Sequence, residues 1–171
     1  PALKTWLARD GMGPVVLDVW ENEPAIDSTL LDQTALGTPH IAGYSLDGKI
    51  NGTMCLYRAL CQFMHIEPDE TMLPHQSVAQ SAWTLKTKDA DEQDLLTQAM
   101  VRIYDIGRDD ENLRKLIHLP ENARASYFDR LRKEYPVRRE AGNYRVTLSP
   151  HHAKAAAYLT ALGFKVTPPP S

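Results

Sequence analysis

The sequence predicts an α/β fold in two parts, residues 1–68 and residues 69–171. Residues 14–19 form a short apolar run that follows glycines, which is typical of a buried strand in a parallel sheet. Residues 91–105 repeat apolar side chains every three to four positions, which predicts a helix. The junction at residues 66–74 contains two prolines and three acidic residues, a composition that favours a linker.

The first part opens with a predicted helix that ends at Gly11. Its apolar face is formed by Leu3, Trp6 and Leu7. After the strand and a proline-containing loop, a second helix is expected from about residue 46 to residue 65. Apolar side chains occur on most sides of that helix, so we expect it to be buried on more than one side.

The second part alternates strands with helices. The expected elements are a strand at 82–87, helices at 91–105, 109–118 and 121–134, a strand at 144–148, a helix opened by Ser149 and Pro150, and a strand at 164–166. This order predicts a small α+β domain.

Composition and charge narrow the function classes. The net charge is −3, and no apolar run reaches the roughly 18–20 residues that a membrane-spanning helix needs, so neither nucleic acid nor a membrane is expected as a partner. Cys55 and Cys61 lie six positions apart and cannot pair within one helix. Two unpaired thiols favour a reducing, cytoplasmic location.

Three residues could carry proton-transfer chemistry. Asp18 lies near the carboxyl end of the first predicted strand, which is the end that faces the ligand crevice in α/β sheets. Glu23 and His40 follow in loops. A carboxylate that accepts from one ring nitrogen of a histidine fixes the tautomer, and the other nitrogen can then exchange a proton near neutral pH. Such a pair suits the reversible oxidation of an alcohol to a ketone.

Simpler interpretations of the same residues remain open on the residues alone. A single histidine in a loop is more often solvated or structurally hydrogen-bonded than catalytic. Glu23, which precedes a proline, could be a surface acid, and Asp18 could cap the next turn.

Two stretches together resemble the D-2-hydroxyacid dehydrogenase family. In "VVLDVWENEP" (15–24) a strand ends in Leu-Asp-Val and a Glu-Pro pair closes the next loop, and "TPHIAGYS" (38–45) places a histidine before small residues. The resemblance spans essentially the whole chain. It implies that residues 1–68 are the C-terminal end of a Rossmann-like NAD-binding domain, and that residues 69–171 are a small α+β domain through which a homodimer forms.

The resemblance also implies roles for five residues. His40 would be the catalytic acid/base, and Glu23 would be its carboxylate partner. Asp18 and Gly43 would lie against bound NAD, since a residue without a Cβ lets the backbone approach a cofactor closely. Tyr44 would contact the substrate, a phosphorylated sugar acid.

Three parts of the family pattern do not occur in this sequence. They are a G-x-G-x-x-G turn for the pyrophosphate, an acidic residue about 20 positions beyond it, and an arginine that holds the substrate carboxylate. The first residue is a proline rather than a methionine. We therefore expect the chain to begin inside a larger protein, to correspond to a C-terminal portion of such a dehydrogenase, and to be inactive as a fragment.

Two other function classes compete with the enzymatic one. The chain could chiefly be a dimerisation or interaction module of another D-2-hydroxyacid dehydrogenase, acting through residues 69–171. It could also be a small-ligand regulatory domain, although such domains are usually ferredoxin-like with four strands, and the helix-rich stretch 91–134 disfavours that fold.

A histidine pair and a basic cluster are two further candidate sites. His151 and His152 are adjacent, and adjacent residues of a helix do not face one site, so no metal is expected. Between Arg124 and Arg145 there are seven basic residues against three acidic ones. That cluster is either a solvated helix face or a basic rim that attracts a phosphorylated substrate or an acidic partner.

Overall fold

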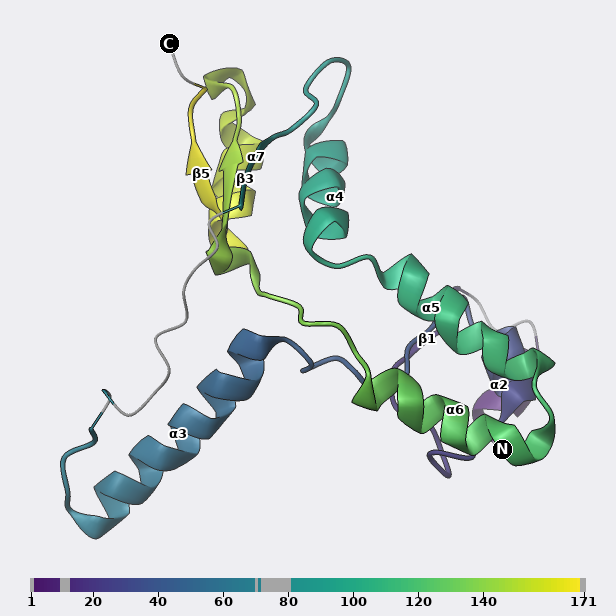
Figure 1. The fold of residues 1–171 in the computed structure, drawn as a ribbon. Helices are drawn as coiled ribbons and strands as arrows, with labels where there is room; N and C mark the ends of the chain where they lie inside the picture. Colours follow the sequence, from purple (N-terminus) through teal and green to yellow (C-terminus); the bar gives the residue numbers. More distant parts are fainter. Residues whose placement is uncertain (1, 10–12, 70, 72–80, 170–171) are drawn as a thin grey trace. The chain divides into compact units, whose positions relative to one another are not determined.

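The computed structural model describes residues 2–9, 13–69, 71 and 81–169. Its contacts group the chain into two compact units (Figure 1). The first unit combines Pro1–Ala42 with Asp105–Pro136, and the second combines Gly43–Tyr104 with Val137–Ser171. The grouping therefore differs from the predicted division into residues 1–68 and 69–171, which stays a prediction.

The first unit contains a two-stranded parallel sheet and several helices. Its elements are α1 (Ala2–Leu7), β1 (Val16–Leu17), α2 (Ser28–Gln33), β2 (Leu36–Gly37), α5 (Ile106–Arg114), the 3₁₀ helix η2 (Lys115–His118) and α6 (Glu121–Lys133). Strand β1 pairs with β2 in parallel, with Val16 opposite Leu36 and Leu17 opposite Gly37. Helix α5 packs against β2, and α6 packs against α5 and η2.

The core of the first unit joins residues that are distant in the sequence. Its buried members are Trp20, Ile26, Leu31, Leu113, Leu116 and Phe128. Local capping helps to define the helices, because the side chain of Asp27 accepts from two amides at the start of α2, and that of Asp105 accepts from an amide at the start of α5. The helices predicted at 109–118 and 121–134 therefore complete this core.

The first predicted strand is parallel, as expected, but it is not buried. Val16 and Val19 are 55% and 61% exposed, and the paired strand is limited to Val16–Leu17. The expectation of burial was wrong, because the sheet has only two described strands and both valine side chains are more than half exposed. The first helix ends at Leu7 with Trp6 47% exposed, whereas its expected end at Gly11 lies outside the described residues.

The second unit contains a three-stranded sheet. Its elements are α3 (Leu46–Met64), β3 (Ser81–Thr84), α4 (Glu92–Ile103), the 3₁₀ helices η3 (Ala141–Asn143) and η4 (Pro150–His152), β4 (Tyr144–Thr147), α7 (Ala153–Ala161) and β5 (Lys165–Thr167). The strand order is β3-β4-β5, and both pairs are parallel. Parallel strands with helical crossovers make this unit α/β rather than the expected α+β, and its described strands do not form a four-stranded ferredoxin-like sheet.

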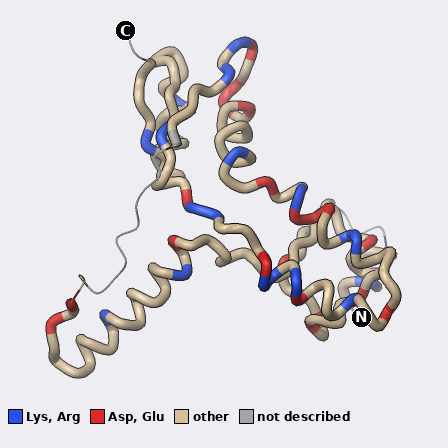
Figure 2. Tube along the Cα trace, in the orientation of Figure 1, with Lys and Arg blue, Asp and Glu red and all other residues tan. Residues whose placement is uncertain are grey.

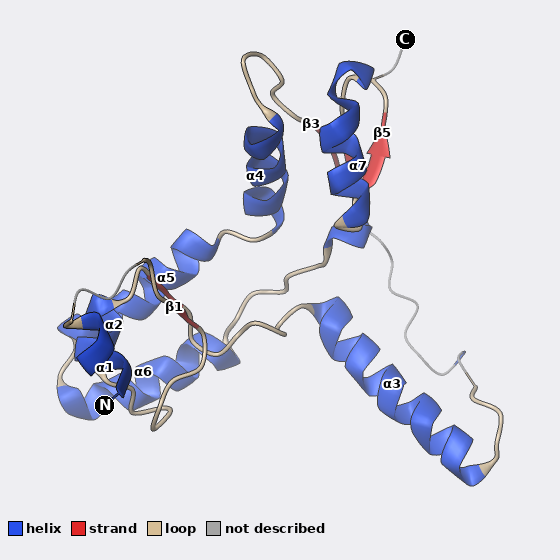
Figure 3. Cartoon of the chain, turned by 180° about the vertical axis from the view of Figure 1, so that it is seen from behind, coloured by secondary structure: helices blue, strands red, loops and turns tan. Residues whose placement is uncertain are grey.

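Helices α4 and α7 pack against each other over one face of this sheet (Figure 3). The strands show why the sheet has one apolar face. Trp83 and Val146 are buried with residues of both helices, while Thr84 and Arg145, their neighbours in the chain, are exposed. This alternation is the period of two that a half-buried strand requires.

Helix α3 has the predicted bounds but not the predicted burial. Ser45 caps its first turn through its hydroxyl, and the helix ends at His65, whose φ of 55° is left-handed. Met54 and Cys61 are buried, but Leu56 and Phe63 are 76% and 81% exposed. Burial on more than one side was therefore wrong, because Met54 and Cys61 are the only residues of α3 that are buried in the described structure.

Charged residues of both signs alternate along α5 and α6 (Figure 2). Several members of the basic cluster serve local structure. Arg124 donates to the carbonyl oxygen of Leu119 and to the hydroxyl of Ser28, and Arg139 forms an ion pair with Asp47. Among the described residues, no helix is both long and apolar enough to span a membrane.

Candidate active site

The loop that follows β2 carries His40 in an unusual backbone conformation. Its φ is 55°, a left-handed value that side-chain-bearing residues adopt rarely and at a cost in free energy. The side chain of Asp18 holds this loop: Oδ1 accepts from the Thr38 hydroxyl at 2.6 Å and from the Ile41 amide at 2.8 Å, and Oδ2 accepts from the Ala42 amide at 3.0 Å. The carbonyl oxygen of Asp18 also accepts from the amide of His40 at 2.8 Å.

The structure brings Glu23 and His40 together. Oε2 of Glu23 lies 2.8 Å from Nδ1 of the His40 ring. An ionised carboxylate can only accept, so this contact favours the tautomer with hydrogen on Nδ1. The other ring nitrogen, Nε2, has no hydrogen bond to any residue that the structure describes. The His40 side chain is 44% exposed and that of Glu23 only 16%, so the ring is open to a ligand while its partner is sheltered.

Trp20 links the two residues of this pair, and sequence reasoning missed it. Its backbone amide donates to Oε1 of Glu23 at 2.8 Å, which fixes the carboxylate. Its buried indole nitrogen donates to the carbonyl oxygen of Thr38 at 2.9 Å, which fixes the loop before His40. The available signal was a tryptophan between two candidate residues, but nothing in the sequence shows what its ring would contact.

Gly43 and Tyr44 belong to the second unit. A Cβ built on Gly43 would meet no atom within 4 Å, so the backbone at this point is open. The Nζ atom of Lys49 lies 4.1 Å from the centroid of the Tyr44 ring. A lysine ammonium therefore lies beside the residue predicted to contact a phosphorylated substrate.

A second carboxylate, Asp110 on α5, binds the last residue of β2, directly before this loop. Its Oδ1 accepts from the amide of Gly37 at 2.7 Å, and its Oδ2 accepts from Nε of Arg114 at 2.8 Å. Sequence reasoning assigned no role to Asp110. The spacing of Asp110 and Arg114 by four residues on a helix was a usable signal for the ion pair, but not for the contact with Gly37.

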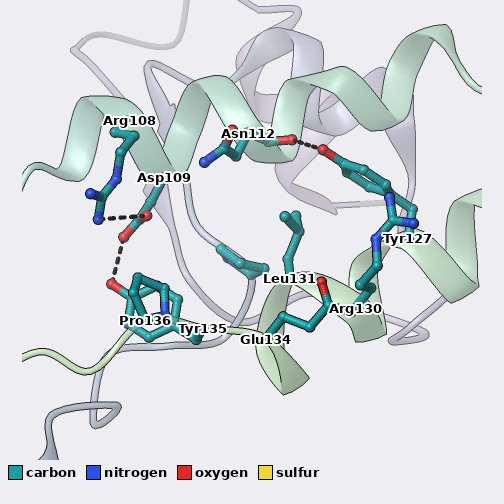
Figure 4. Close-up of a pocket in the computed structure, with 10 residues that line it drawn as sticks. Arg108, Asp109, Asn112, Tyr127, Arg130, Leu131, Glu134, Tyr135 and Pro136 are labelled. Carbon is teal, nitrogen blue, oxygen red and sulfur yellow. Dashed lines mark hydrogen bonds and ion pairs between the residues drawn. The ribbon is translucent and has the colours of Figure 1, made fainter.

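A cavity of about 330 Å³ lies between α5, α6 and the loop (Figure 4). Its wall includes Pro39, the residue before His40, but neither His40 nor Glu23. Asp109 accepts from the hydroxyl of Tyr135 at 2.7 Å. Burial raises the pKa of Tyr127, against an opposing effect of Arg130, whose guanidinium lies 5.0 Å from the centroid of the Tyr127 ring.

The arrangement around His40 suits one kind of chemistry. A histidine with a fixed tautomer, an open Nε2 and a sheltered carboxylate behind Nδ1 can take a proton from a hydroxyl group and return it. Three of the roughly four acceptor positions of the Asp18 carboxylate bind the loop, and the fourth is left for the cofactor contact that the sequence predicts. Its cap-like role, the simpler interpretation, is therefore present in the structure.

The chain belongs to the family described as "Domain of unknown function (DUF3410)", whose model matches residues 72–163. Its curated relatives carry a more specific name. It is 41% identical over 168 residues to the erythronate-4-phosphate dehydrogenase of Marinobacter nauticus, a match that covers 96% of this chain and 43% of the relative. It is 44% identical over 169 residues to that of Teredinibacter turnerae, covering 96% and 42%, and 40% identical over 157 residues to that of Proteus mirabilis, covering 90% and 39%.

The comparisons confirm a resemblance that the sequence itself suggests. Beyond the family signature, "HIAGYSLDGKINGT" (40–53), "RIYDIGRDDENLRKL" (102–116) and "FDRLRKEYPVRRE" (128–140) look like erythronate-4-phosphate dehydrogenase in particular. The chain spans less than half the length of these relatives.

Proposed function

We propose that this chain is part of an NAD-dependent dehydrogenase that oxidises 4-phospho-D-erythronate to 3-hydroxy-2-oxo-4-phosphooxybutanoate, a step in pyridoxal 5'-phosphate synthesis. The observation that carries the proposal is the 2.8 Å contact between Glu23 and Nδ1 of His40, which leaves Nε2 open. The relatives, which are named erythronate-4-phosphate dehydrogenases, supply the substrate class.

In the proposed reaction, Nε2 of His40 takes the proton of the substrate's C2 hydroxyl. The hydrogen on C2 leaves with its electron pair as the carbon–oxygen double bond forms, and the chemistry that bound NAD would supply is that of a hydride acceptor. Glu23 keeps Nδ1 protonated before the transfer and stabilises the imidazolium after it. In the reverse direction, the same imidazolium returns the proton to the alkoxide oxygen.

The residues of this chain fit an NAD site in part. Gly43 has open space where a Cβ would be, and Asp18 keeps capacity to accept one further hydrogen bond beside those that hold the loop. Both would lie on the nicotinamide side. Residues 1–68, which contain the parallel β1–β2 pair, would then be the C-terminal end of a Rossmann-like domain. Tyr44, with Lys49 over its ring, would face the phosphate of the substrate.

We also propose that the whole protein is a homodimer assembled through residues 69–171. The apolar and aromatic side chains of α6 do not support this interface, because Phe128 is fully buried and Tyr127 and Leu131 pack against the core of the first unit. The proposal rests instead on the family resemblance and on two exposed apolar residues, Tyr158 of α7 and Leu162 directly after it. An interaction module of another D-2-hydroxyacid dehydrogenase is the alternative.

The test is a substrate comparison with the full-length protein that contains this chain. NADH formation is followed with 4-phospho-D-erythronate, with D-erythronate and with 3-phospho-D-glycerate. The proposal expects the highest kcat/KM for the first, with the unphosphorylated acid much poorer. Preference for a different 2-hydroxy acid would favour the alternative, and no NADH with any of the three would reject the proposed activity.

A further inference from the structure

The amide of Gly37 is a fixed point three residues before His40. Gly37 is buried, and a Cβ at this position would lie 2.7 Å from Cδ1 of Leu31 and 2.9 Å from Cζ2 of Trp20. No side chain therefore fits at this position without displacing Leu31 or Trp20. A buried amide without an acceptor costs free energy, and the acceptor here is Oδ1 of Asp110, 2.7 Å away.

The carboxylate of Asp110 is itself held by Arg114. Nε of Arg114 donates to Oδ2 of Asp110 at 2.8 Å, and the other two guanidinium nitrogens donate to the carbonyl oxygens of Leu31 at 3.1 Å and Thr34 at 2.8 Å. The Asp110 side chain is only 11% exposed. Asp110 and Arg114 thus bind backbone groups of Leu31, Thr34 and Gly37 through charge-assisted hydrogen bonds, which are stronger than neutral ones.

His40 needs such support because its backbone conformation is strained. A left-handed residue other than glycine persists only where the surroundings fix it. Asp18 binds the loop on both sides of His40, at the Thr38 hydroxyl and at the amides of Ile41 and Ala42. Asp110 binds it before His40, at Gly37.

We propose that Asp110, held by Arg114, is a positioning residue for His40: it fixes the start of the loop so that the imidazole meets Glu23 with Nε2 free. This inference rests on the proposed dehydrogenase function for its effect on rate, but not for its effect on the ring. It gives the segment Asp105–Pro136 a role in the active site. Asp110 touches neither substrate nor cofactor and acts only through the loop.

Asp109 provides a matched control on the same helix. It is also buried, at 5% exposure against 8% for Asp110. Its carboxylate faces the cavity and accepts from Tyr135 rather than from the loop (Figure 4). Asp109→Asn therefore perturbs a buried carboxylate of the same helical turn without touching Gly37.

The experiment compares Asp110→Leu, Asp110→Asn and Asp109→Asn. In the full-length protein, Asp110→Leu should lower kcat by about 100-fold, as expected when a catalytic group is displaced by about 1 Å, with KM and NAD affinity within about twofold of the wild type. Asp110→Asn should lose less, because its amide oxygen can still accept from Gly37. It also keeps the test decisive if the leucine variant does not fold. Asp109→Asn should keep the wild-type kcat.

A second readout does not depend on catalysis. In the 171-residue chain labelled with ¹⁵N-histidine, the His40 signals are identified by their loss in His40→Gln. The wild type should show hydrogen on Nδ1, and Asp110→Leu should show a mixture of tautomers, whereas Asp109→Asn should match the wild type. If the full-length wild type is inactive but the tautomer changes in this way, the positioning role stands and the proposed reaction is wrong. An active wild type with unchanged kcat and tautomer in both Asp110 variants, or equal losses in Asp109→Asn, overturns the inference.

Discussion

The ring nitrogen Nδ1 of His40 lies 2.8 Å from Oε2 of Glu23, although the residues are seventeen positions apart in the chain. Trp20 donates its backbone amide to the second oxygen of the same carboxylate. The carboxylate is thus fixed by the protein on one side and by the imidazole on the other. A fixed carboxylate behind a histidine determines which ring nitrogen can react.

Glu23→Gln should therefore impair proton transfer rather than binding. The glutamine side chain can donate to Nδ1, which would place the hydrogen of the neutral ring on Nε2, the nitrogen that must take the substrate proton. We expect kcat in the full-length protein to fall by about 100-fold or more, since the wrong tautomer has cost even more in a comparable triad. KM should change little. Asp32→Asn, which alters an exposed acid of α2, is the control, and an equal kcat in Glu23→Gln and the wild type would remove Glu23 from its role.

The 171-residue chain on its own should form no NADH from 4-phospho-D-erythronate. Its sequence contains no G-x-G-x-x-G turn, and the family's carboxylate-binding arginine has no counterpart in it. Groups that position both reactants supply many orders of magnitude of rate. The full-length protein, assayed in parallel, shows that the conditions support catalysis. Clear turnover by the shorter chain would contradict the expectation that its active site is incomplete.

The chain should form a two-fold dimer. Light scattering at micromolar concentration should give twice the chain mass of 19.2 kDa. We expect the dimer interface to bury more than roughly 1,000 Å² in total. The whole chain is needed, because Asp105–Pro136 packs in one unit with Pro1–Ala42. Leu162→Glu, directly after α7, should give a monomer, whereas Leu56→Glu on α3, outside residues 69–171, should not. A monomeric wild type, or a reversed response of the two variants, would contradict assembly through residues 69–171.

Stability should depend on pH through Asp47. Burial acts to raise the pKa of Asp47, but hydrogen bonds from Arg139, the Glu140 amide and Asn143 outweigh it, so the pKa lies below its ordinary value of 3.8. A carboxylate whose pKa falls on folding stabilises the protein above its ordinary pKa, and this contribution is lost as the pH falls through the lowered value. Asp47→Asn should therefore lower the free energy of unfolding by about 1–3 kcal/mol near pH 7.

That difference in unfolding free energy should begin to shrink as the pH falls below 3.8, and it should vanish once the pH falls through the lowered pKa, because the carboxyl of the folded wild type is then protonated and uncharged like the asparagine amide. Urea unfolding of the wild type and of Asp47→Asn across the pH range measures this difference in unfolding free energy. Glu92→Gln, which changes an exposed acid of α4, should show no comparable difference at any pH. A constant difference between Asp47→Asn and the wild type down to low pH would mean that its charge is not the cause.

The helices of this protein could be predicted from the sequence, whereas the contacts between distant segments and the burial of β1 and α3 could not. The helix expected at 46–65 is α3, because its cap and its apolar repeat lie within the segment itself. The Glu23–His40 contact followed from family resemblance, since spacing alone left other roles open. The contact of Asp110 with Gly37 joins residues 73 positions apart, and periodicity cannot show which core an amphipathic helix will join. For the same reason, the exposure of β1 and α3 was not foreseen.

The most direct measurement of the central claim is the effect of His40→Gln on each step of the reaction. In the full-length protein, NAD affinity is measured by fluorescence titration, and NADH formation from 4-phospho-D-erythronate is measured in a single turnover. If Nε2 of His40 takes the hydroxyl proton, NAD should bind within about twofold of the wild-type affinity, and the single-turnover rate should fall by roughly 100- to 10,000-fold. A single-turnover rate close to that of the wild type would contradict the account.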